Sequence, residues 1–429
     1  MPTKPTFVQD TLQHLSDKSR RAGGKSTTTF ADNMKLPVHR WYRYSAGYSA
    51  TWARDLAQFW QSTSVLDPFG GSGTTVLAAQ EVGIPATGAE IHPTVARIAN
   101  AKLDWGKDSE GYMDAIEEVI SRAREITEIV HPNAPLFVKC FPDKESADAL
   151  ISIRDAVLQV KGEYEDLIWL TFVSIIRACS PAGTAQWQYV LPNNRKSRVV
   201  EPFEAFKAAA ESFADDMKMR QFLVQDPVSA KVLLTDARSL VGIEDKGFDT
   251  VITSPPYANN YDYADTLRLE LIVLGEIEGW KDLRPLREQL LLSATQNIGS
   301  RSDDEALDSM LMAPIMNEFL PVYKELDEVR RTRGGNKKYH SMLSGYFYDN
   351  AQVFSALREK LVSGSKVCYV VGDSAPYGVH APVEKWLGEL ALNAGFNAWE
   401  FTKVRDRNTK WKNRKHRHPL HEGYLWIEG

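Results

Sequence analysis

The sequence predicts an α/β protein built on an open sheet. Two observations support this fold class. A short apolar strand, a glycine-rich turn and a helix follow one another near residue 70, and a later apolar strand runs into two consecutive prolines, Pro255 and Pro256. Strand, glycine turn and helix in this order form the nucleotide-binding layout of open α/β sheets. Because the 429 residues exceed a typical single domain, we expect one core with insertions or two domains.

The glycine-rich turn lies at residues 68–75, between a predicted buried strand at 64–67 and a helix that begins near Val76. Glycines let the backbone approach a ligand closely and take positive φ angles. The helix N-terminus offers unpaired N–H groups to a carboxylate of that ligand. The candidate ligand-binding residues of this segment are Asp67, Phe69, Gly70, Gly71, Gly73, Thr74 and Thr75.

A second predicted strand, residues 86–91, ends in an acid. Glu90 stands about twenty residues beyond the glycine turn, where a carboxylate can accept both ribose hydroxyls of a nucleotide. Ile91 beside it can cover one face of an adenine. Upstream, Ser49 is expected to cap a helix that leads into the first strand. Downstream, residues 230–235 form a third predicted strand with Asp236 at its carboxyl end.

The apolar run at residues 248–252 leads through Thr253 into Ser254, Pro255, Pro256 and Tyr257. Two prolines remove ladder donors and fix φ near −65°, so the chain must leave the sheet there in one rigid shape. That shape places the Ser254 hydroxyl, the free carbonyl of Pro255 and the aromatic face of Tyr257 around one small binding site. Such a site suits a flat base with an exocyclic amine.

The motifs DPFGGSGTT at 67–75 and SPPY at 254–257, together with Glu90, resemble those of the DNA amino-methyltransferases. These enzymes methylate cytosine N4 or adenine N6 with S-adenosylmethionine. The serine form SPPY is most similar to the cytosine-N4 branch, whereas the adenine branch more often has Asp or Asn at the first position. The glycine loop precedes SPPY here, which departs from members with the reverse order. The resemblance implies a Rossmann-like seven-stranded methyltransferase sheet with helical insertions.

The resemblance also implies the roles of single residues. Tyr48 and Ser49 would help to hold the methionine end of S-adenosylmethionine. Asp236 and Ala237 would meet the adenine amino group, and Thr253 would belong to the cofactor site. The catalytic residues would be Ser254, Pro255, Pro256 and Tyr257.

The expected chemistry is direct methyl transfer. An exocyclic amine is a poor nucleophile because its lone pair is delocalised into the ring. Hydrogen bonds from the amine to the Ser254 hydroxyl and the Pro255 carbonyl would favour a pyramidal nitrogen with a directed lone pair, so catalysis needs positioning more than acid–base power. A base in a duplex must first be extruded, and Tyr257 would stack on it.

Three alternatives remain open at the level of sequence. They are an adenine-N6 enzyme on the same scaffold, an RNA base methyltransferase, and an inactive nucleic-acid-binding subunit. The sequence argues against a cytosine-C5 mechanism, because that mechanism needs a cysteine after proline and none of the cysteines follows proline. Family analogy alone implies a role in restriction–modification or host defence.

We expect the catalytic domain to comprise residues 1–105, 226–257 and 346–429. Apolar residues at helical spacing predict a helical insertion at 106–225. Residues 258–345 form a second predicted helical insertion with a cationic loop, and this insertion is the candidate target-recognition region. Asn and Tyr side chains at 259–263 could touch the extruded base.

The net charge of −5 excludes a protein that is basic throughout, but DNA binding needs only a local basic surface. The candidate surface consists of two main segments, with a smaller cluster at 195–198. The residues that we expect to bind nucleic acid are Arg330, Arg331, Arg333, Lys337, Lys338, Arg405, Arg407, Lys412, Arg414 and Lys415. Trp411 is interleaved among them, as is common where bases stack.

Composition indicates the compartment and the partners. Three scattered cysteines suggest a reducing cytoplasm without a disulfide framework or a metal site. No apolar run approaches the 18–20 residues of a membrane span, and the first residues lack the apolar core of a secretory signal. We therefore expect a cytoplasmic protein with DNA as its partner, no metal and no membrane association. A restriction or defence-system protein is a candidate second partner.

Overall fold

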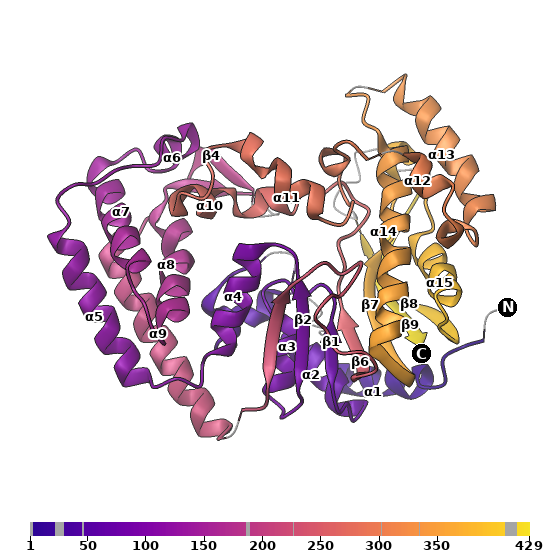
Figure 1. Ribbon diagram of the computed structural model, residues 1–429, viewed down its shortest axis with the longest axis horizontal. Helices are drawn as coiled ribbons and strands as arrows, with labels where there is room; N and C mark the ends of the chain where they lie inside the picture. Colours follow the sequence, from indigo (N-terminus) through magenta and orange to yellow (C-terminus); the bar gives the residue numbers. More distant parts are fainter. Residues whose placement is uncertain are drawn as a thin grey trace.

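A seven-stranded sheet forms the centre of the computed structural model (Figure 1), which describes residues 3–21, 30–44, 47–185, 189–225, 227–301, 303–333, 335–407 and 418–429. The strand order is β5-β2-β1-β6-β7-β9-β8, and β9 runs antiparallel to both neighbours. The bounds of the strands are β1 Val65–Asp67, β2 Ala86–Glu90, β5 Ala230–Leu234, β6 Phe248–Thr253, β7 Leu361–Gly372, β8 Ala398–Arg407 and β9 Leu420–Glu428. This arrangement confirms the predicted Rossmann-like sheet, including the late antiparallel strand.

The order of the strands reverses between β1 and β6. From β1 the chain proceeds outward through β2 to β5, and it then returns to place β6 on the other side of β1. Ligands of open α/β sheets bind at such a switch point, outside the carboxyl ends of the strands. The two loops that leave these strands are the glycine turn and the SPPY turn, so the topology brings both motifs to one place.

The central strands are buried on both faces, as parallel strands covered by helices must be. Val65, Ile252 and Cys368 belong to a core that includes the helices on one face. Their neighbours Leu66, Val251 and Val367 belong to the core on the other face. Side chains alternate between the two faces because successive residues of a strand point in opposite directions.

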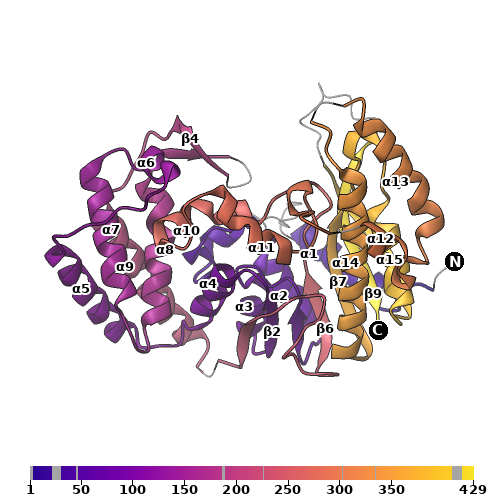
Figure 2. The same ribbon diagram turned by 45° about the horizontal axis from the view of Figure 1, so that its top comes forward.

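Helices cover both faces of the sheet and extend beyond it on two sides (Figures 1 and 2). α2, α3 and α4 pack against the strands of the first half, whereas α14 and α15 pack against β7 and its neighbours. The bounds are α1 Val8–Arg21, η1 Phe30–Lys35, η2 His39–Trp41, α2 Ala50–Phe59, α3 Thr74–Gln80, α4 Pro93–Leu103, α13 Met316–Arg330, α14 Tyr339–Lys360, η7 Pro376–Gly378 and α15 Val383–Asn393.

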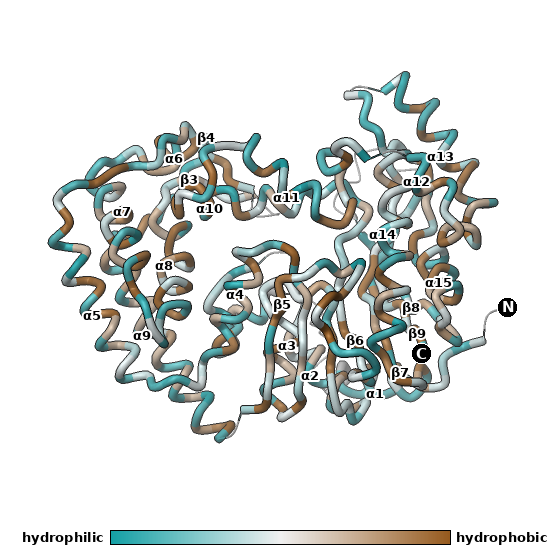
Figure 3. The backbone as a smooth tube through the Cα atoms, in the orientation of Figure 1, coloured by the Kyte–Doolittle hydropathy of each residue, from teal (hydrophilic) through white to brown (hydrophobic). Residues whose placement is uncertain are grey.

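The segment between β2 and β5 forms a helical lobe that packs on α4 through α8. Hydrophobic and hydrophilic residues alternate along its helices (Figure 3), as expected when each helix buries one stripe. The lobe contains α5 Ser109–Glu125, α6 Pro135–Cys140, α7 Lys144–Leu158, α8 Glu165–Cys179 and α9 Pro202–Leu223. It also contains a two-stranded sheet, β3 Ala182–Thr184 with β4 Val190–Arg195, which the helical periodicity did not predict.

The segment between β6 and α14 crosses above the carboxyl edge of the sheet. In both orientations α10 and α11 lie between the helical lobe and α12 (Figures 1 and 2). Its elements are η3 Ala264–Leu267, α10 Arg268–Leu274, η4 Trp280–Leu283, α11 Arg284–Gln289, η5 Thr295–Asn297, α12 Asp303–Leu307 and η6 Met310–Met312. The division of the chain into one catalytic domain and two insertions stays a prediction.

α14 begins at Tyr339, where His340 to Leu343 are already buried, and it leads directly into β7, which begins at Leu361. None of the described helices combines the length and apolar character that crossing a bilayer requires.

Candidate active site

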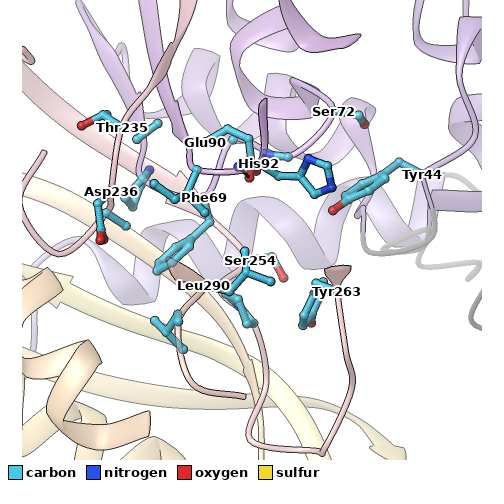
Figure 4. A pocket seen from close by; sticks show the side chains of 18 of the residues that line it. Tyr44, Phe69, Ser72, Glu90, His92, Thr235, Asp236, Ser254, Tyr263 and Leu290 are labelled. Atoms are coloured by element: carbon cyan, nitrogen blue, oxygen red, sulfur yellow. Dashed lines mark hydrogen bonds between the residues drawn. The ribbon is translucent and has the colours of Figure 1, made fainter. Parts of the chain in front are cut away.

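A pocket opens at the carboxyl edge of the sheet, where β1, β2, β5 and β6 end. Its side chains converge from both motifs and from the segment that crosses above them (Figure 4). Eleven predicted residues line it, namely Tyr48, Phe69, Gly70, Gly71, Thr74, Glu90, Ile91, Asp236, Ala237, Ser254 and Pro256. The predicted Ser49, Asp67, Gly73, Thr75, Thr253, Pro255 and Tyr257 are not in this lining.

The sequence analysis missed the other lining residues. Most of them adjoin predicted positions, such as Pro68, Ser72, Ala89, His92, Thr235 and Arg238. Tyr44 and Gly47 come from the aromatic segment before α2, and Tyr263 follows the SPPY turn. Gln289, Leu290 and Leu291 have no local signal in the sequence, because their place in the wall arises only from tertiary packing.

The glycine turn adopts the conformations that its glycines permit. Gly71 and Gly73 have φ angles of +50° and +83°, a region that side chains strongly disfavour. Gly73 is the N-cap of α3. A Cβ atom at Gly73 would lie 3.2 Å from the Cβ of Ala99, so a side chain there would press against α4.

Glu90 connects the second strand to the glycine turn. Its carboxylate accepts hydrogen bonds from the backbone N–H of Gly71 at 3.0 Å and of His92 at 2.8 Å. Burial raises the pKa of Glu90 to about 7, although these backbone hydrogen bonds act in the opposite direction. A carboxylate with this geometry is held rigidly and has further lone pairs for hydroxyl donors.

Part of the pocket wall is apolar, and we name this part the apolar slot. Phe69, Ile91, Ala237, Leu290 and Leu291 line it, and Figure 4 shows Phe69 and Leu290 on the same side as Asp236. Such a slot suits a flat aromatic ring.

Asp236 is not a free carboxylate. Both of its oxygens accept hydrogen bonds from Arg238, with Nη2 2.6 Å from Oδ2 and Nε 3.0 Å from each oxygen. A donor from a bound ring would therefore share this carboxylate with Arg238.

The SPPY turn contributes part of the pocket wall. Ser254 and Pro256 line the cavity, whereas Tyr257 contacts the tip of β8. The guanidinium carbon of Arg407 lies 5.3 Å from the centre of the Tyr257 ring, and Arg407 Nη1 donates to the carbonyl of Asp373 at 3.0 Å. The hydroxyls of Ser254 and Tyr257 share a hydrogen bond. The turn is therefore supported by the ends of β7 and β8.

Beneath the pocket, a buried polar cluster joins the two motif loops. Asp67 Oδ1 accepts from Thr253 Oγ1 at 2.6 Å and from the backbone N–H of Phe69 at 3.0 Å. The Tyr48 hydroxyl contacts Thr75 Oγ1, and Thr75 donates to the carbonyl of Ile252 at 3.0 Å. Burial raises the pKa of Asp67 to about 6. Tyr48 therefore belongs to the buried polar cluster through its hydroxyl and also lines the pocket.

Ser49 lies at the start of α2 and is not in the pocket lining. Its hydroxyl accepts from the backbone N–H of Trp52 at 3.3 Å and caps α2. This confirms the predicted cap, while the proposed cofactor contact of Ser49 stays a prediction.

The donor set of the pocket fits a sulfonium nucleoside. A carboxylate for ribose, Glu90, lies between an apolar slot and a glycine turn at a helix N-terminus. Phe69, Ile91 and Ala237 would enclose the adenine, and Gly70, Gly71 and Thr74 would face the methionine end. S-Adenosylmethionine bound there would supply an electrophilic methyl group.

The predicted cationic residues are partly neutralised. Asp327 pairs with Arg330 at 2.6 Å and with Arg331 at 2.6 Å, and Glu422 pairs with Arg405 at 2.8 Å. Arg333 and Lys338 are exposed, and Lys337 is half-buried. Arg407 lies against the SPPY turn. The predicted residues Lys412, Arg414 and Lys415, with Trp411, lie outside the described residues.

One cluster near β7 has the composition of a cation site. Asp373, Glu384 and His421 each offer a ligand atom within 4.8 Å of the others. However, His421 places Nδ1 3.1 Å from Asp373 and Nε2 3.3 Å from Glu384. His421 therefore bridges the two carboxylates through its two ring nitrogens, and one imidazole cannot present both nitrogens to a single ion.

Comparisons with known proteins agree with the geometry. A family model described as DNA methylase, of the N6/N4 methyltransferase type, matches residues 61–101, which contain β1, the glycine turn and β2. The chain is 27% identical to the Type II methyltransferase M.BsoBI of Geobacillus stearothermophilus, and the alignment covers 89% of this chain and 83% of that protein. It is 24% identical to the Type II methyltransferase M.AvaI of Anabaena variabilis, with 90% and 85% covered. A shorter match, 21% identical over 59% of this chain and 61% of that protein, joins it to the Type II methyltransferase M.MvaI of Kocuria varians.

Proposed function

Because this chain belongs to the N4/N6 family of DNA methyltransferases, we propose that it transfers a methyl group from S-adenosylmethionine to the exocyclic N4 of cytosine in a specific DNA sequence. The observation that carries the proposal is one shared pocket. Ser254 and Pro256 of the SPPY turn line the same cavity as the glycine turn and Glu90. The relatives M.BsoBI and M.AvaI are named Type II methyltransferases, which supports a role in a restriction–modification system.

The residues of the pocket would divide the work between binding and positioning. Glu90 would accept both ribose hydroxyls, while Asp236 would share its carboxylate between Arg238 and the adenine amino group. The polar cluster of Asp67, Thr75 and Thr253 would hold the floor of the pocket and the start of the SPPY turn in a fixed relation. Reacting groups must meet within a few tenths of an ångström, so such rigidity contributes to rate.

The SPPY turn would prepare the amine. The Ser254 hydroxyl and the Pro255 carbonyl accept hydrogen bonds from the exocyclic amine, which directs its lone pair toward the incoming methyl. The nitrogen–carbon bond forms as the carbon–sulfur bond breaks, and the nitrogen then releases a proton to water. The target base must leave the duplex to reach this turn. Tyr257 would stack on it with the ring face that Arg407 does not cover.

The serine at position 254 is the reason to prefer cytosine over adenine as the substrate. The test is methylation of duplex DNA by the purified protein with S-adenosylmethionine, followed by mass spectrometry of the digested nucleosides. We expect N4-methylcytosine. N6-Methyladenine would refute the cytosine assignment and retain the family chemistry. Methylation of transfer RNA but not of duplex DNA would refute DNA as the substrate, and failure to bind S-adenosylmethionine would indicate an inactive DNA-binding subunit.

A further inference from the structure

One wall of the pocket comes from a segment far from the motifs. Gln289, Leu290 and Leu291 lie at the end of α11 and contribute to the lining, and we name residues 288–292 the pocket-wall segment. The other lining residues belong to the loops around β1, β2, β5 and β6 and to the segment before α2, which contributes Tyr44, Gly47 and Tyr48. The segment itself has little regular secondary structure after Gln289, so its position must be fixed by contacts with other elements.

Arginine side chains hold the backbone of the pocket-wall segment. Arg301 Nη2 donates to the carbonyls of Glu288 at 3.2 Å and Leu290 at 3.3 Å. Arg238 Nη2 donates to the carbonyl of Gln289 at 2.8 Å. Three consecutive carbonyls of the segment thus accept from charged donors, which form stronger hydrogen bonds than neutral ones.

Asp349 of α14 organises both arginines. Its Oδ2 accepts from Arg301 Nη1 at 2.8 Å and from the backbone N–H of Leu292 at 2.8 Å. Its Oδ1 accepts from Arg238 Nη1 at 3.2 Å. Asp349 is only 2% exposed, so these charge pairs are shielded from water and their geometry is restricted.

A notch in α14 receives the end of the same segment. A Cβ atom added to Gly345 would lie 2.2 Å from Cδ2 of Leu292, so only glycine leaves space for this leucine. The pocket-wall segment is therefore held by its carbonyls, by the N–H of Leu292 and by the Leu292 side chain.

We propose that Arg301 and Asp349 are positioning residues that hold the pocket-wall segment against the adenosine part of the cofactor. The inference rests on the proposed function, since it takes the ligand to be S-adenosylmethionine. Arg301 belongs to the segment between β6 and α14 for which we expect target recognition. That segment would then take part in cofactor binding as well.

The location of the wall determines the kinetic signature. Leu290 lines the pocket on the same side as Asp236, the residue that we expect at the adenine amino group (Figure 4). Contacts with the adenosine part are the same before and during methyl transfer. Losing them weakens binding of the ground state and the transition state equally, so KM rises while kcat is unchanged.

The decisive variant is Arg301→Met, because the Arg301 side chain is 27% exposed and can be replaced without burying a new polar group. We expect the Kd values for S-adenosylmethionine and for S-adenosylhomocysteine to rise by the same factor, about tenfold, because three charge-assisted hydrogen bonds are lost, two of them to the pocket-wall segment. We expect kcat to stay within about twofold. Arg301→Lys keeps one charge beside Asp349 and should give an intermediate Kd.

Arg284→Met is the matched control. Arg284 also contacts Glu288, but through an exposed pair between side chains, 2.8 Å long, with Arg284 73% exposed. Exposed pairs contribute little, so its Kd should equal that of the wild type. Gly345→Ala is a second test of the same wall, since it displaces Leu292 without changing any charge, and it should also raise Kd.

Isothermal titration calorimetry, steady-state kinetics and the Tm of each variant decide between the outcomes. A lower Tm for Arg301→Met with unchanged Kd would show a structural role only and overturn the inference. A fall in kcat as large as the rise in KM would also overturn it, because the residue would then act on the chemical step. If the wild-type protein bound no S-adenosylmethionine, the proposed function would fail, and this inference with it.

Discussion

Cofactor affinity should decline as the pH falls through 7, because of one carboxylate. Glu90 has a pKa of about 7 in the free protein, raised by burial. Only its ionised form can accept both ribose hydroxyls, so ligand binding requires the proton to leave. For a single group with a pKa of about 7, the ionised fraction is about nine-tenths at pH 8 and about one-tenth at pH 6. The apparent Kd for S-adenosylmethionine should therefore be about tenfold higher at pH 6 than at pH 8.

Calorimetry between pH 5.5 and 8.5, in buffers of different ionisation enthalpy, measures both the Kd and the protons released on binding. Glu90→Gln is the control, and it should bind more weakly with a Kd that hardly depends on pH. Two neighbours titrate elsewhere: burial lowers the pKa of His92 to about 4, and Asp67 titrates at about 6. A flat wild-type profile would refute the reasoning. An equal slope in Glu90→Gln would assign the titration to another group. The first candidate is Lys102, because burial lowers its pKa to about 7 and its ammonium group donates to the carbonyl of Ser72 in the glycine turn.

Further substitutions test the turn and the glycine loop. Ser254→Ala should lower kcat by about 100-fold and leave the Kd for S-adenosylmethionine within about twofold, as followed by transfer of a labelled methyl group and by calorimetry; parallel losses would contradict a role restricted to the amine. Tyr257→Ala should reduce turnover far more than cofactor affinity, and equal losses in both would count against stacking on the base. Gly73→Val should lower both Tm and cofactor affinity, because its positive φ and the 3.2 Å approach to Ala99 leave no place for a side chain. The control Gly83→Val has a φ of +74° but no atom within 4 Å of an added Cβ, so a greater loss of Tm at Gly73 isolates the contact with α4, and equal losses would assign the whole effect to backbone strain.

The parts of the site that sequence could predict are those encoded locally. A glycine turn between a strand and a helix, an acid at the next strand end and a proline pair after an apolar run each constrain their own backbone. The parallel topology then brings these strand ends to one edge, so Gly71, Glu90 and Ser254 share a pocket.

The remaining parts depend on contacts across long separations in the chain. Gln289 to Leu291 line the pocket in a segment whose backbone binds Arg301 and Asp349, which are distant from it in the sequence or lie on another element. The contact between Gly73 and α4 has the same origin. The positive φ angle of Gly73 could be predicted from the glycine-rich turn, but its neighbour Ala99 on α4 could not. The pairing of Asp236 with Arg238 was also missed, because the spacing of two residues along a loop does not show whether two side chains meet.

The polar cluster under the pocket has a consequence for motion. Asp67, Thr75 and Thr253 couple residues 67–75 to residues 252–254 through bonds that water does not reach. Neither loop can unfold locally without exposing the other's buried donors and acceptors, so amide deuterium uptake in both should occur with one common rate and one common activation enthalpy. We therefore expect the two motif loops to open and close together, as a single cooperative unit.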